Sequence, residues 1–309
     1  MEVMQMIESA QGPTLAAAEV AQPKPGRGQI LIRVYAAGVT TTELHWDPTT
    51  HKKSGEPRLN AIPGHEFSGV IAAIGSGADG FNIGQEVYGM NDWYAEGATA
   101  EYCLTEPSSI ARKPASLTHE AAATVPIGAL TAWQGLLDRV KLQRGERVLV
   151  HGGSGGVGVF AVQLAHIPGA HVIATTSSHT VALVRELGAD EIIDYKTARF
   201  EQVIDPVDVV FDTVGGETRE RSWSVLKPGG RMVSIVGDGG ADPRAKDAFF
   251  IVEPNHLQLV EVAKMLDAGS LKTFVNAAVP LNDAATAYAG KVQQKRGYGK
   301  VVVVIGSNR

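Results

Sequence analysis

The chain has 309 residues, 44% of them hydrophobic, so at about 100 to 200 residues per domain it can form two domains with apolar cores. Lys and Arg number 28 against 33 Asp and Glu, a formal net charge of −5 without runs of like charge, which argues against nucleic-acid or anionic-membrane partners. The one cysteine, Cys103, excludes an intrachain disulfide, and without an export signal or an 18-residue apolar window the expected location is the cytoplasm.

The first part of the chain is rich in predicted β-strands. Residues 29–39 alternate between apolar and polar side chains, and residues 67–74 form an apolar run followed by turn-forming glycines. Residues 119–138 are helix-like instead, so the change of pattern predicts a domain boundary at 117–122.

Strands and helices then alternate. Strands are predicted at 147–151, 171–175, 191–195, 207–214, 231–236 and 249–253, with helices at 159–165, 180–187 and 256–268. Such alternation favours right-handed crossovers and a doubly wound parallel sheet with helices on both faces. The tail from residue 271 contains another helix and the strand VVVVI, which we expect to return to the first domain. The predicted α/β fold therefore has one domain at 1–121 with 271–309, and a second at 122–270.

A glycine-rich motif follows the first of these strands. Gly153, Gly155 and Gly158 form G-x-G-x-x-G between a predicted strand and a predicted helix. In dinucleotide-binding folds such glycines allow a tight turn, close approach of the pyrophosphate and packing of the helix on the sheet. The motif in this context predicts a dinucleotide site, and a purely structural turn is the alternative.

The end of the second strand indicates which dinucleotide is bound. An NAD site carries Asp or Glu there for the ribose hydroxyl, whereas this strand ends in VIATTSSHT without an acid. Ser177 and Ser178 can donate hydrogen bonds to a 2′-phosphate and His179 can add positive charge. We therefore predict NADPH as the cofactor. The alternative is a polar loop that only caps the helix beginning at Thr180.

Motifs along nearly the whole chain resemble the medium-chain dehydrogenase/reductase superfamily, and within it the zinc-free quinone oxidoreductase (zeta-crystallin-like) branch. They occur in the family's order and include AAGVTTTELH, IPGHEFSGVIAAIG, GALTAWQGLL, GGSGGVG, FDTVGG, LKPGGRMVSIVG and GKVVVVIG. The resemblance implies a β-rich GroES-like catalytic domain built from both chain ends, a Rossmann domain between them and a homodimer. It also implies cofactor contacts at Thr131, Gly153, Ser154, Gly155, Gly156, Val157, Gly158, Thr176, Ser177, Ser178, His179, Tyr195, Val214, Val236 and Gly237.

The zinc alcohol dehydrogenases of the same superfamily are the nearest alternative. The resemblance places their Cys, His and Cys zinc ligands at Thr40, His65 and Ile127, where only His65 can bind zinc well. No metal site is therefore predicted, and His65 is expected to hydrogen-bond in the catalytic cleft. A rearranged zinc site that uses His65 with Glu66, Glu43 or His45 is the alternative.

Without zinc, the favoured acceptors are quinones and α,β-unsaturated carbonyls, because they delocalise the charge that follows hydride transfer. Thr40 and Thr42 are the candidate donors to the acceptor oxygen, and Thr42 with His45 matches the proton relay of the zinc enzymes by resemblance. The alternative is that these threonines only satisfy a turn. Trp46, Trp93 and Tyr94 are candidate walls of an aromatic site, and Cys103 is expected to be a packed apolar side chain.

The expected function is an NADPH-dependent quinone or enone reductase. The alternatives are a zinc-type alcohol or aldehyde reductase, an enoyl thioester reductase, and a dinucleotide-binding protein with little turnover. The apolar run at 249–253, expected as a strand late in the Rossmann sheet, independently predicts a homodimer, because an exposed edge strand can pair with its copy.

Overall fold

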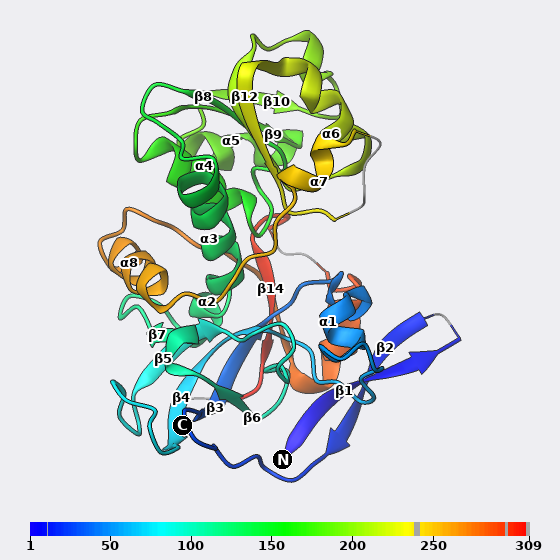
Figure 1. Cartoon of the computed structure of the whole chain (residues 1–309), viewed down its shortest axis with the longest axis vertical. Coiled ribbons are helices and arrows are strands. Elements are labelled where there is room, and N and C mark those ends of the chain that lie inside the picture. The colour runs from blue at the N-terminus through cyan, green and yellow to red at the C-terminus, as the bar shows by residue number, and fades with distance from the viewer. Residues whose placement is uncertain (11, 238–241, 294–295, 307–309) are drawn as a thin grey trace. The chain divides into compact units, whose positions relative to one another are not determined.

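The computed structural model describes residues 1–10, 12–237, 242–293 and 296–306. The chain divides into two compact units. Unit 1 comprises Met1–Ile127, Pro254–Ser270 and Phe274–Arg309, and unit 2 comprises Gly128–Glu253 with Leu271–Thr273. In Figure 1, unit 1 accordingly contains both the blue and the red ends of the colour scale, whereas unit 2 is mainly green and yellow.

Unit 1 is built on a mixed sheet. Its strand order is β13 (Val275–Pro280), β14 (Lys300–Val304), β3 (Ile30–Gly38), β4 (Glu66–Ile74), β5 (Glu86–Met90) and β7 (Ile110–Arg112), and β6 (Tyr102–Thr105) also pairs with β3. The β13–β14 pair is parallel and the other pairs are antiparallel. The terminal strand β14 pairs with residues 36–38 of β3. The predicted return of the chain to the first domain is therefore confirmed.

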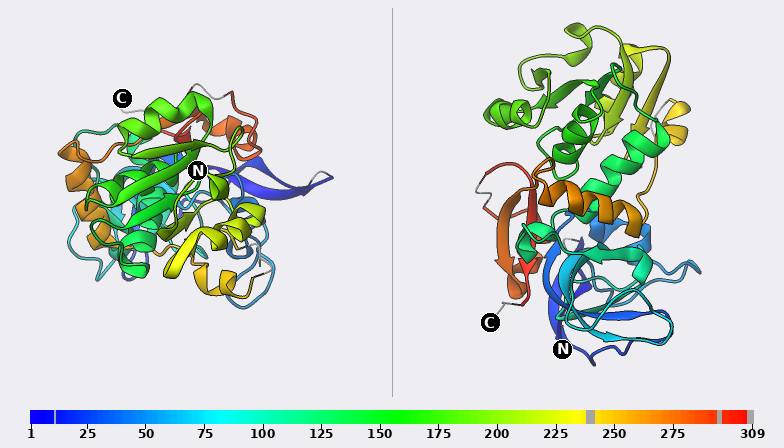
Figure 2. Two further views of the ribbon diagram at one scale, coloured as in Figure 1. Left: turned by 90° about the horizontal axis from the view of Figure 1, so that it is seen from above. Right: turned by 90° about the vertical axis from the view of Figure 1, so that its left-hand side faces the viewer.

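Shorter elements complete unit 1. A hairpin of β1 (Glu2–Ser9) and β2 (Gly12–Glu19) is the dark blue arm of Figures 1 and 2. The helical elements are η1 (Glu43–His45), α1 (Asp47–Thr50), η2 (Pro107–Ser109), α2 (His119–Ala122), α8 (His256–Asp267), η7 (Leu281–Asp283) and α9 (Ala284–Tyr288). No helix in the described part of the chain is long and apolar enough to cross a membrane.

The core of unit 1 follows from the alternation in its strands. Ile30, Ile32 and Val34 point to one face of β3 and pack with Phe67 and Ile71 of β4. Cys103 lies in the same cluster at 2% exposure, and burial raises the pKa of its thiol to about 12. The structure therefore confirms Cys103 as a packed side chain.

Unit 2 is a doubly wound parallel sheet. Its strand order is β10 (Glu191–Asp194), β9 (His171–Thr176), β8 (Arg147–Val150), β11 (Val207–Asp212) and β12 (Leu226–Ser234), and every pair is parallel. The helical elements are α3 (Pro126–Trp133), which begins two residues before the unit, the π-helical turn η3 (Gln134–Arg139), α4 (Gly158–His166), η4 (Ser178–Thr180), α5 (Val181–Glu186), η5 (Phe200–Gln202), α6 (Gly216–Ser222), η6 (Trp223–Val225) and α7 (Arg244–Ala248). Helices lie on both sides of these strands in Figure 2. The strand order reverses between β8 and β11, the position where open α/β sheets bind ligands.

Two strand predictions need correction. Residues 249–253 form no strand in the described chain, and an isolated bridge joins Phe249 to Ser234. The strand predicted at 231–236 begins earlier, at Leu226, and therefore includes Pro228. Proline is tolerated there because β12 is the last strand of the described sheet, where a missing backbone N–H costs no hydrogen bond to a further strand.

The helix-like region 119–138 is also divided. Helix α2 ends at Ala122 and α3 starts at Pro126, whose ring would clash with the carbonyl of residue 122 in a continuous helix. Helix α8, expected from its sequence position to close the second domain, groups with unit 1. The reason is packing on unit 1 side chains and strands, since Tyr88 Oη donates to the Leu259 carbonyl at 2.6 Å and His256 Nδ1 lies 2.6 Å from the Ile110 carbonyl.

Candidate active site

The glycine loop, residues 151–158, joins the end of β8 to α4. A β-carbon on Gly158 would lie 2.0 Å from the carbonyl oxygen of Gly152, so this position excludes every side chain. Gly152 itself has a φ of +70°. A β-carbon on Gly155 would make only an ordinary contact, 3.4 Å from the Gly152 carbonyl oxygen, and Gly155 is exposed, so the loop is accessible on that side. The loop is therefore tight where it packs on the sheet and open where a phosphate would approach its backbone.

His151 fixes the start of this loop. Ser222 Oγ donates to the Thr218 carbonyl, so at 2.8 Å it accepts from His151 Nε2. Thr175 Oγ1 lies 3.2 Å from the other ring nitrogen, Nδ1, and accepts from Gly152 N at 3.1 Å. Burial lowers the pKa of His151 to about 4, although Asp212 opposes the shift. A neutral imidazole thus links β8, β9 and α6 behind the glycine loop.

Hydroxyl groups gather at the end of β9. Thr176 Oγ1 donates to Ser154 Oγ of the glycine loop at 3.0 Å and lies 2.6 Å from Thr180 Oγ1. Ser177 Oγ lies 3.2 Å from His179 Nε2, and the side chain is buried, whereas Ser178 and His179 are exposed. The structure thus brings the predicted selector residues together with the glycine loop, and the accessible part of this cluster is Ser178 and His179.

The remaining predicted cofactor contacts lie at or near strand ends of unit 2, except one. Tyr195 follows β10 at 60% exposure, Val214 follows β11 at 51%, and Val236 and Gly237 follow β12. Thr131 lies instead on α3 and is buried at 3% exposure. All but Thr131 thus share the carboxyl edge of the parallel sheet with the glycine loop.

Asp212 shapes that edge from inside. Its carboxylate is fully buried and accepts hydrogen bonds from the backbone N–H groups of Val214 and Gly215 and from Ser234 Oγ at 2.7 Å. The side chain therefore holds the turn that presents Val214 and ties β11 to β12.

A second group of residues lies in unit 1, in the turn that follows β3. Thr40 is half-buried, and Thr42 and His45 are exposed on either side of the buried Glu43. The backbone N–H of His45 donates to the Thr42 carbonyl at 3.0 Å. Within the described residues no hydrogen bond joins the side chains of Thr42 and His45, so the predicted relay is not assembled in this conformation.

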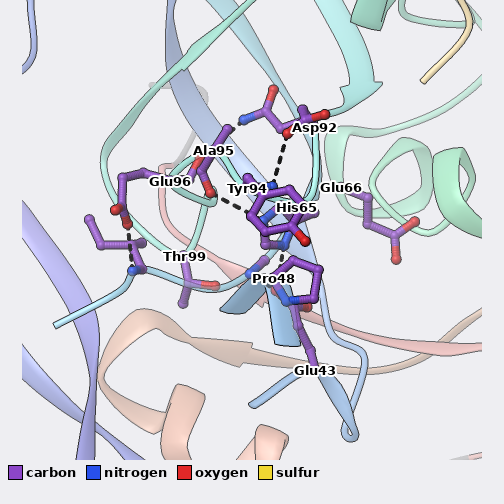
Figure 3. A network of polar contacts seen from close by, with 12 residues as sticks. Glu43, Pro48, His65, Glu66, Asp92, Tyr94, Ala95, Glu96 and Thr99 are labelled. Atoms are coloured by element: carbon purple, nitrogen blue, oxygen red, sulfur yellow. Dashed lines mark hydrogen bonds and ion pairs between the residues drawn. The ribbon is translucent and has the colours of Figure 1, made fainter. Parts of the chain in front are cut away.

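His65 connects this turn to a second segment, as Figure 3 shows. Its Nδ1 lies 2.7 Å from Glu43 Oε1, which also accepts from Gly64 N at 2.7 Å. Its Nε2 lies 3.2 Å from the Ala95 carbonyl, which can only accept, so Nε2 carries a hydrogen. His65 and Glu43 are both about 1% exposed or less. His65 is thus a buried bridge that does not reach solvent.

Glu66 points away from His65 and pairs with the terminal strand. One carboxylate oxygen contacts Lys300 Nζ of β14, and the other accepts from Ile127 N at 3.0 Å. A β-carbon on Gly38 would lie 2.5 Å from Glu66 Oε1, so the glycine makes room for the pair. Burial lowers the pKa of Lys300, to about 7, and Glu43 opposes the shift. Glu66 therefore ties β4 to β14 and to the segment of Ile127.

Two family models match the chain in order. An alcohol dehydrogenase GroES-like domain matches residues 26–135, and a zinc-binding dehydrogenase matches residues 187–303. A probable zinc-binding oxidoreductase, mitochondrial, from Arthroderma benhamiae is 32% identical over 94% of this chain and 93% of its own length. The NADPH-dependent alkenal/one oxidoreductase, chloroplastic, of Arabidopsis thaliana is 33% identical over 91% of this chain and 73% of its own. The solved quinone oxidoreductase from Coxiella burnetii superposes with a TM-score of 0.86 at 29% identity, covering 99% of both chains.

The chain belongs to the medium-chain dehydrogenase/reductase superfamily, in its zeta-crystallin-like branch. This confirms the resemblance drawn from the sequence, together with the combination of a GroES-like and a Rossmann domain. The protein is an oxidoreductase of the medium-chain type.

The donor set of this medium-chain oxidoreductase departs from that of a zinc site. Thr40 offers a neutral hydroxyl and Ile127 offers no donor, while His65 directs Nε2 at a carbonyl. Glu43 occupies the outer position from which a carboxylate commonly orients a metal-binding histidine. Among the residues that the structure describes, no three His, Cys, Asp or Glu side chains gather as a metal site requires. These side chains do not fit a catalytic zinc ion.

The sequence does not reveal the structural roles of four residues that shape the site: Glu43, His151, Asp212 and Lys300. Glu43 is considered there only as a zinc ligand, and nothing marks a carboxylate as the partner of a histidine 22 residues away. For His151 and Asp212 a signal exists, because each polar residue lies at the end of an apolar strand beside a glycine turn. Lys300 pairs with a residue 234 positions earlier, which only the closed fold reveals.

Proposed function

We propose that this protein is an NADPH-dependent reductase of quinones and α,β-unsaturated carbonyls that works without zinc. The observation that carries the proposal is the pairing of two sites in one chain. A glycine loop without a carboxylate at the neighbouring strand end lies in unit 2, and in unit 1 Thr40 and Ile127 stand at two of the positions that zinc ligands would occupy. The names of the Arabidopsis and Coxiella relatives agree with this class of acceptor.

The residues of unit 2 fit a phosphorylated nicotinamide dinucleotide. Gly155 is exposed at the turn that leads into α4, so a pyrophosphate could approach the backbone at this helix N-terminus. Ser178 and His179 are exposed donors at the end of β9, a segment that carries no acidic side chain of its own to repel a 2′-phosphate. Tyr195 and Val214 are exposed at the neighbouring strand ends and are suited to contact the adenosine half of the cofactor.

A nicotinamide held there would supply the hydride, and the chain would supply position and charge stabilisation. After transfer to a quinone or enone, negative charge develops on the acceptor oxygen. Thr40 and Thr42 lie in one turn and carry hydroxyl groups that can donate to that oxygen. His45, exposed two residues from Glu43, can return a proton to the turn from solvent. Unactivated ketones, which need a Lewis acid, are expected to be poor acceptors.

A zinc-dependent reaction is the second candidate, because the relative from Arthroderma benhamiae is named a probable zinc-binding oxidoreductase. The two candidates differ in one measurement. NADPH oxidation is followed at 340 nm with 9,10-phenanthrenequinone, a short aliphatic enone and an aliphatic ketone, with and without a strong chelator, and the metal content of the protein is determined. We expect quinone and enone reduction that persists in chelator at less than one tenth of a zinc ion per chain. One tightly bound zinc whose removal abolishes activity would overturn the zinc-free mechanism, and cofactor binding without turnover of any acceptor would overturn the reductase.

A further inference from the structure

His65 connects two segments of unit 1 that each carry a tryptophan. Through Nδ1 it contacts Glu43, in the turn that leads to Trp46, and through Nε2 it contacts the Ala95 carbonyl, two residues after Trp93. Because His65 is buried at 1% exposure, both contacts are shielded from water. The histidine therefore fixes the spacing of the two segments.

The two tryptophans meet at a right-angled junction, here called the aromatic corner (Trp46 and Trp93). Their ring centroids are 5.1 Å apart and the ring planes are inclined by 80°. The His65 ring packs on Trp93 at 5.2 Å and supports it from the interior. Both indoles are only partly buried, so each retains surface that a ligand can cover. Indoles in such an arrangement offer rigid apolar surface at a low cost in conformational entropy.

Trp46 of the aromatic corner lies in the same turn as the candidate hydrogen-bond donors. Thr42, Glu43 and Trp46 are connected by the backbone bonds of η1, in which the N–H of Trp46 donates to the Glu43 carbonyl at 3.1 Å. An acceptor whose oxygen is bonded by the threonines must therefore extend its body near this turn. A planar fused-ring molecule can cover an indole there, whereas a short aliphatic chain cannot.

We propose that the aromatic corner makes this protein selective for planar, fused-ring quinones over short aliphatic enones. The proposal rests on the proposed reductase function for its kinetic consequences, but it also predicts binding that needs no turnover. Trp46 and Trp93 act as specificity determinants, and His65 and Glu43 act as positioning residues that keep the two indoles at their angle.

The test compares Trp46→Leu and Trp93→Leu with the wild type. The ratio of kcat/KM for 9,10-phenanthrenequinone to kcat/KM for 3-penten-2-one should fall about three- to tenfold in each variant, because leucine cannot stack. Trp46→Phe and Trp93→Phe should retain most of the ratio. Trp223→Leu is the matched control, because Trp223 is a partly buried indole of unit 2 outside the corner, with the Arg244 guanidinium 4.2 Å from its ring centroid.

Two further measurements separate this proposal from the proposed function. Equilibrium dialysis of 9,10-phenanthrenequinone should give weaker binding to the leucine variants than to the wild type, whether or not the quinone is reduced. In the wild type, KM should fall from 1,4-benzoquinone to 1,4-naphthoquinone to 9,10-phenanthrenequinone. This measurement does not depend on whether the variants fold. Quinone binding that depends on the corner but is not followed by turnover would overturn the proposed reductase function and support the proposed role of the corner. An unchanged ratio of the two kcat/KM values together with unchanged binding in folded variants would overturn the proposed role of the corner. The absence of a ring-size trend in the wild type would also overturn it.

Discussion

Two buried histidines, His65 and His151, differ in the hydrogen-bond partners of their ring nitrogens. His65 donates from Nε2 to a carbonyl and faces a carboxylate with Nδ1, so it lies in an environment of acceptors. His151 lies between two hydroxyl groups, one of which must accept from it because its own hydrogen is given to the Thr218 carbonyl. The partners of each ring thus decide where its hydrogen lies, and burial keeps the His151 ring neutral.

The neutral state of His151 predicts that acid destabilises the fold. Burial lowers its pKa from 6.5 to about 4, so between these values the unfolded chain binds a proton that the folded chain does not. Stability is therefore lost as pH falls through this window, and the loss between pH 7.5 and pH 4.5 should be about 2 to 3 kcal/mol. Urea unfolding at both pH values should show this loss in the wild type and a smaller one in His151→Asn. His166→Asn, at an exposed histidine, is the control, and equal losses in all three proteins would refute the assignment.

Ser177 tests the choice of cofactor. Its hydroxyl lies against His179 and Thr180 at the end of β9, so an aspartate there would place a negative charge beside the site proposed for the 2′-phosphate. We expect the wild type to bind NADPH more tightly than NADH, and Ser177→Asp to lower that ratio about tenfold or more. Calorimetric titration with both cofactors measures it. Ser177→Ala, which removes the hydroxyl without adding charge, should change the ratio less, and an aspartate variant with the wild-type ratio would exclude this strand end as the selector.

At the scale of elements, the sequence predicts what depends on local pattern. The strand, glycine turn and helix at 147–165 are visible because apolar periodicity and glycine spacing agree over adjacent residues. The start of β12 is missed because Lys227, Pro228, Gly229 and Gly230 disfavour a strand. Leu226 pairs with Val207 of β11, but a register shift separates this pair from the next, Arg231 with Val209. Local propensity therefore cannot show that the strand begins before the irregular stretch.

Elements whose position depends on distant partners cannot be placed in this way. Helix α8 follows the last Rossmann strand in the chain, so its sequence position suggests the second domain. Tyr88 and Ile110, more than 140 residues earlier, hold it in unit 1. The candidate site follows the same rule. The glycine loop is predictable from one short motif, but the Glu66–Lys300 pair joins positions 234 residues apart.

At the scale of the whole molecule, the edge of the unit 2 sheet determines how copies of the chain can associate. In the described sheet, β12 is the last strand, and residues 249–253 approach it through the Phe249 bridge and through Phe250 N, which donates to the Ser234 carbonyl. Phe250 and Val252 are buried while Ile251 is 54% exposed, which is the alternation of a strand without a full ladder. An extended apolar segment at a sheet edge can pair with a second copy.

We therefore predict a homodimer in which residues 249–253 of two copies pair about a twofold axis, as an isologous interface requires. Light scattering at micromolar concentration should give about twice the chain mass of 32.6 kDa. Ile251→Arg should shift the protein toward the monomer, because the charged side chain would have to be desolvated at the new edge. Leu257→Arg, at a 73% exposed apolar residue on α8, is the control and should remain dimeric. A monomeric wild type would refute the dimer, and a dimer that persists in Ile251→Arg would place its interface elsewhere than this edge.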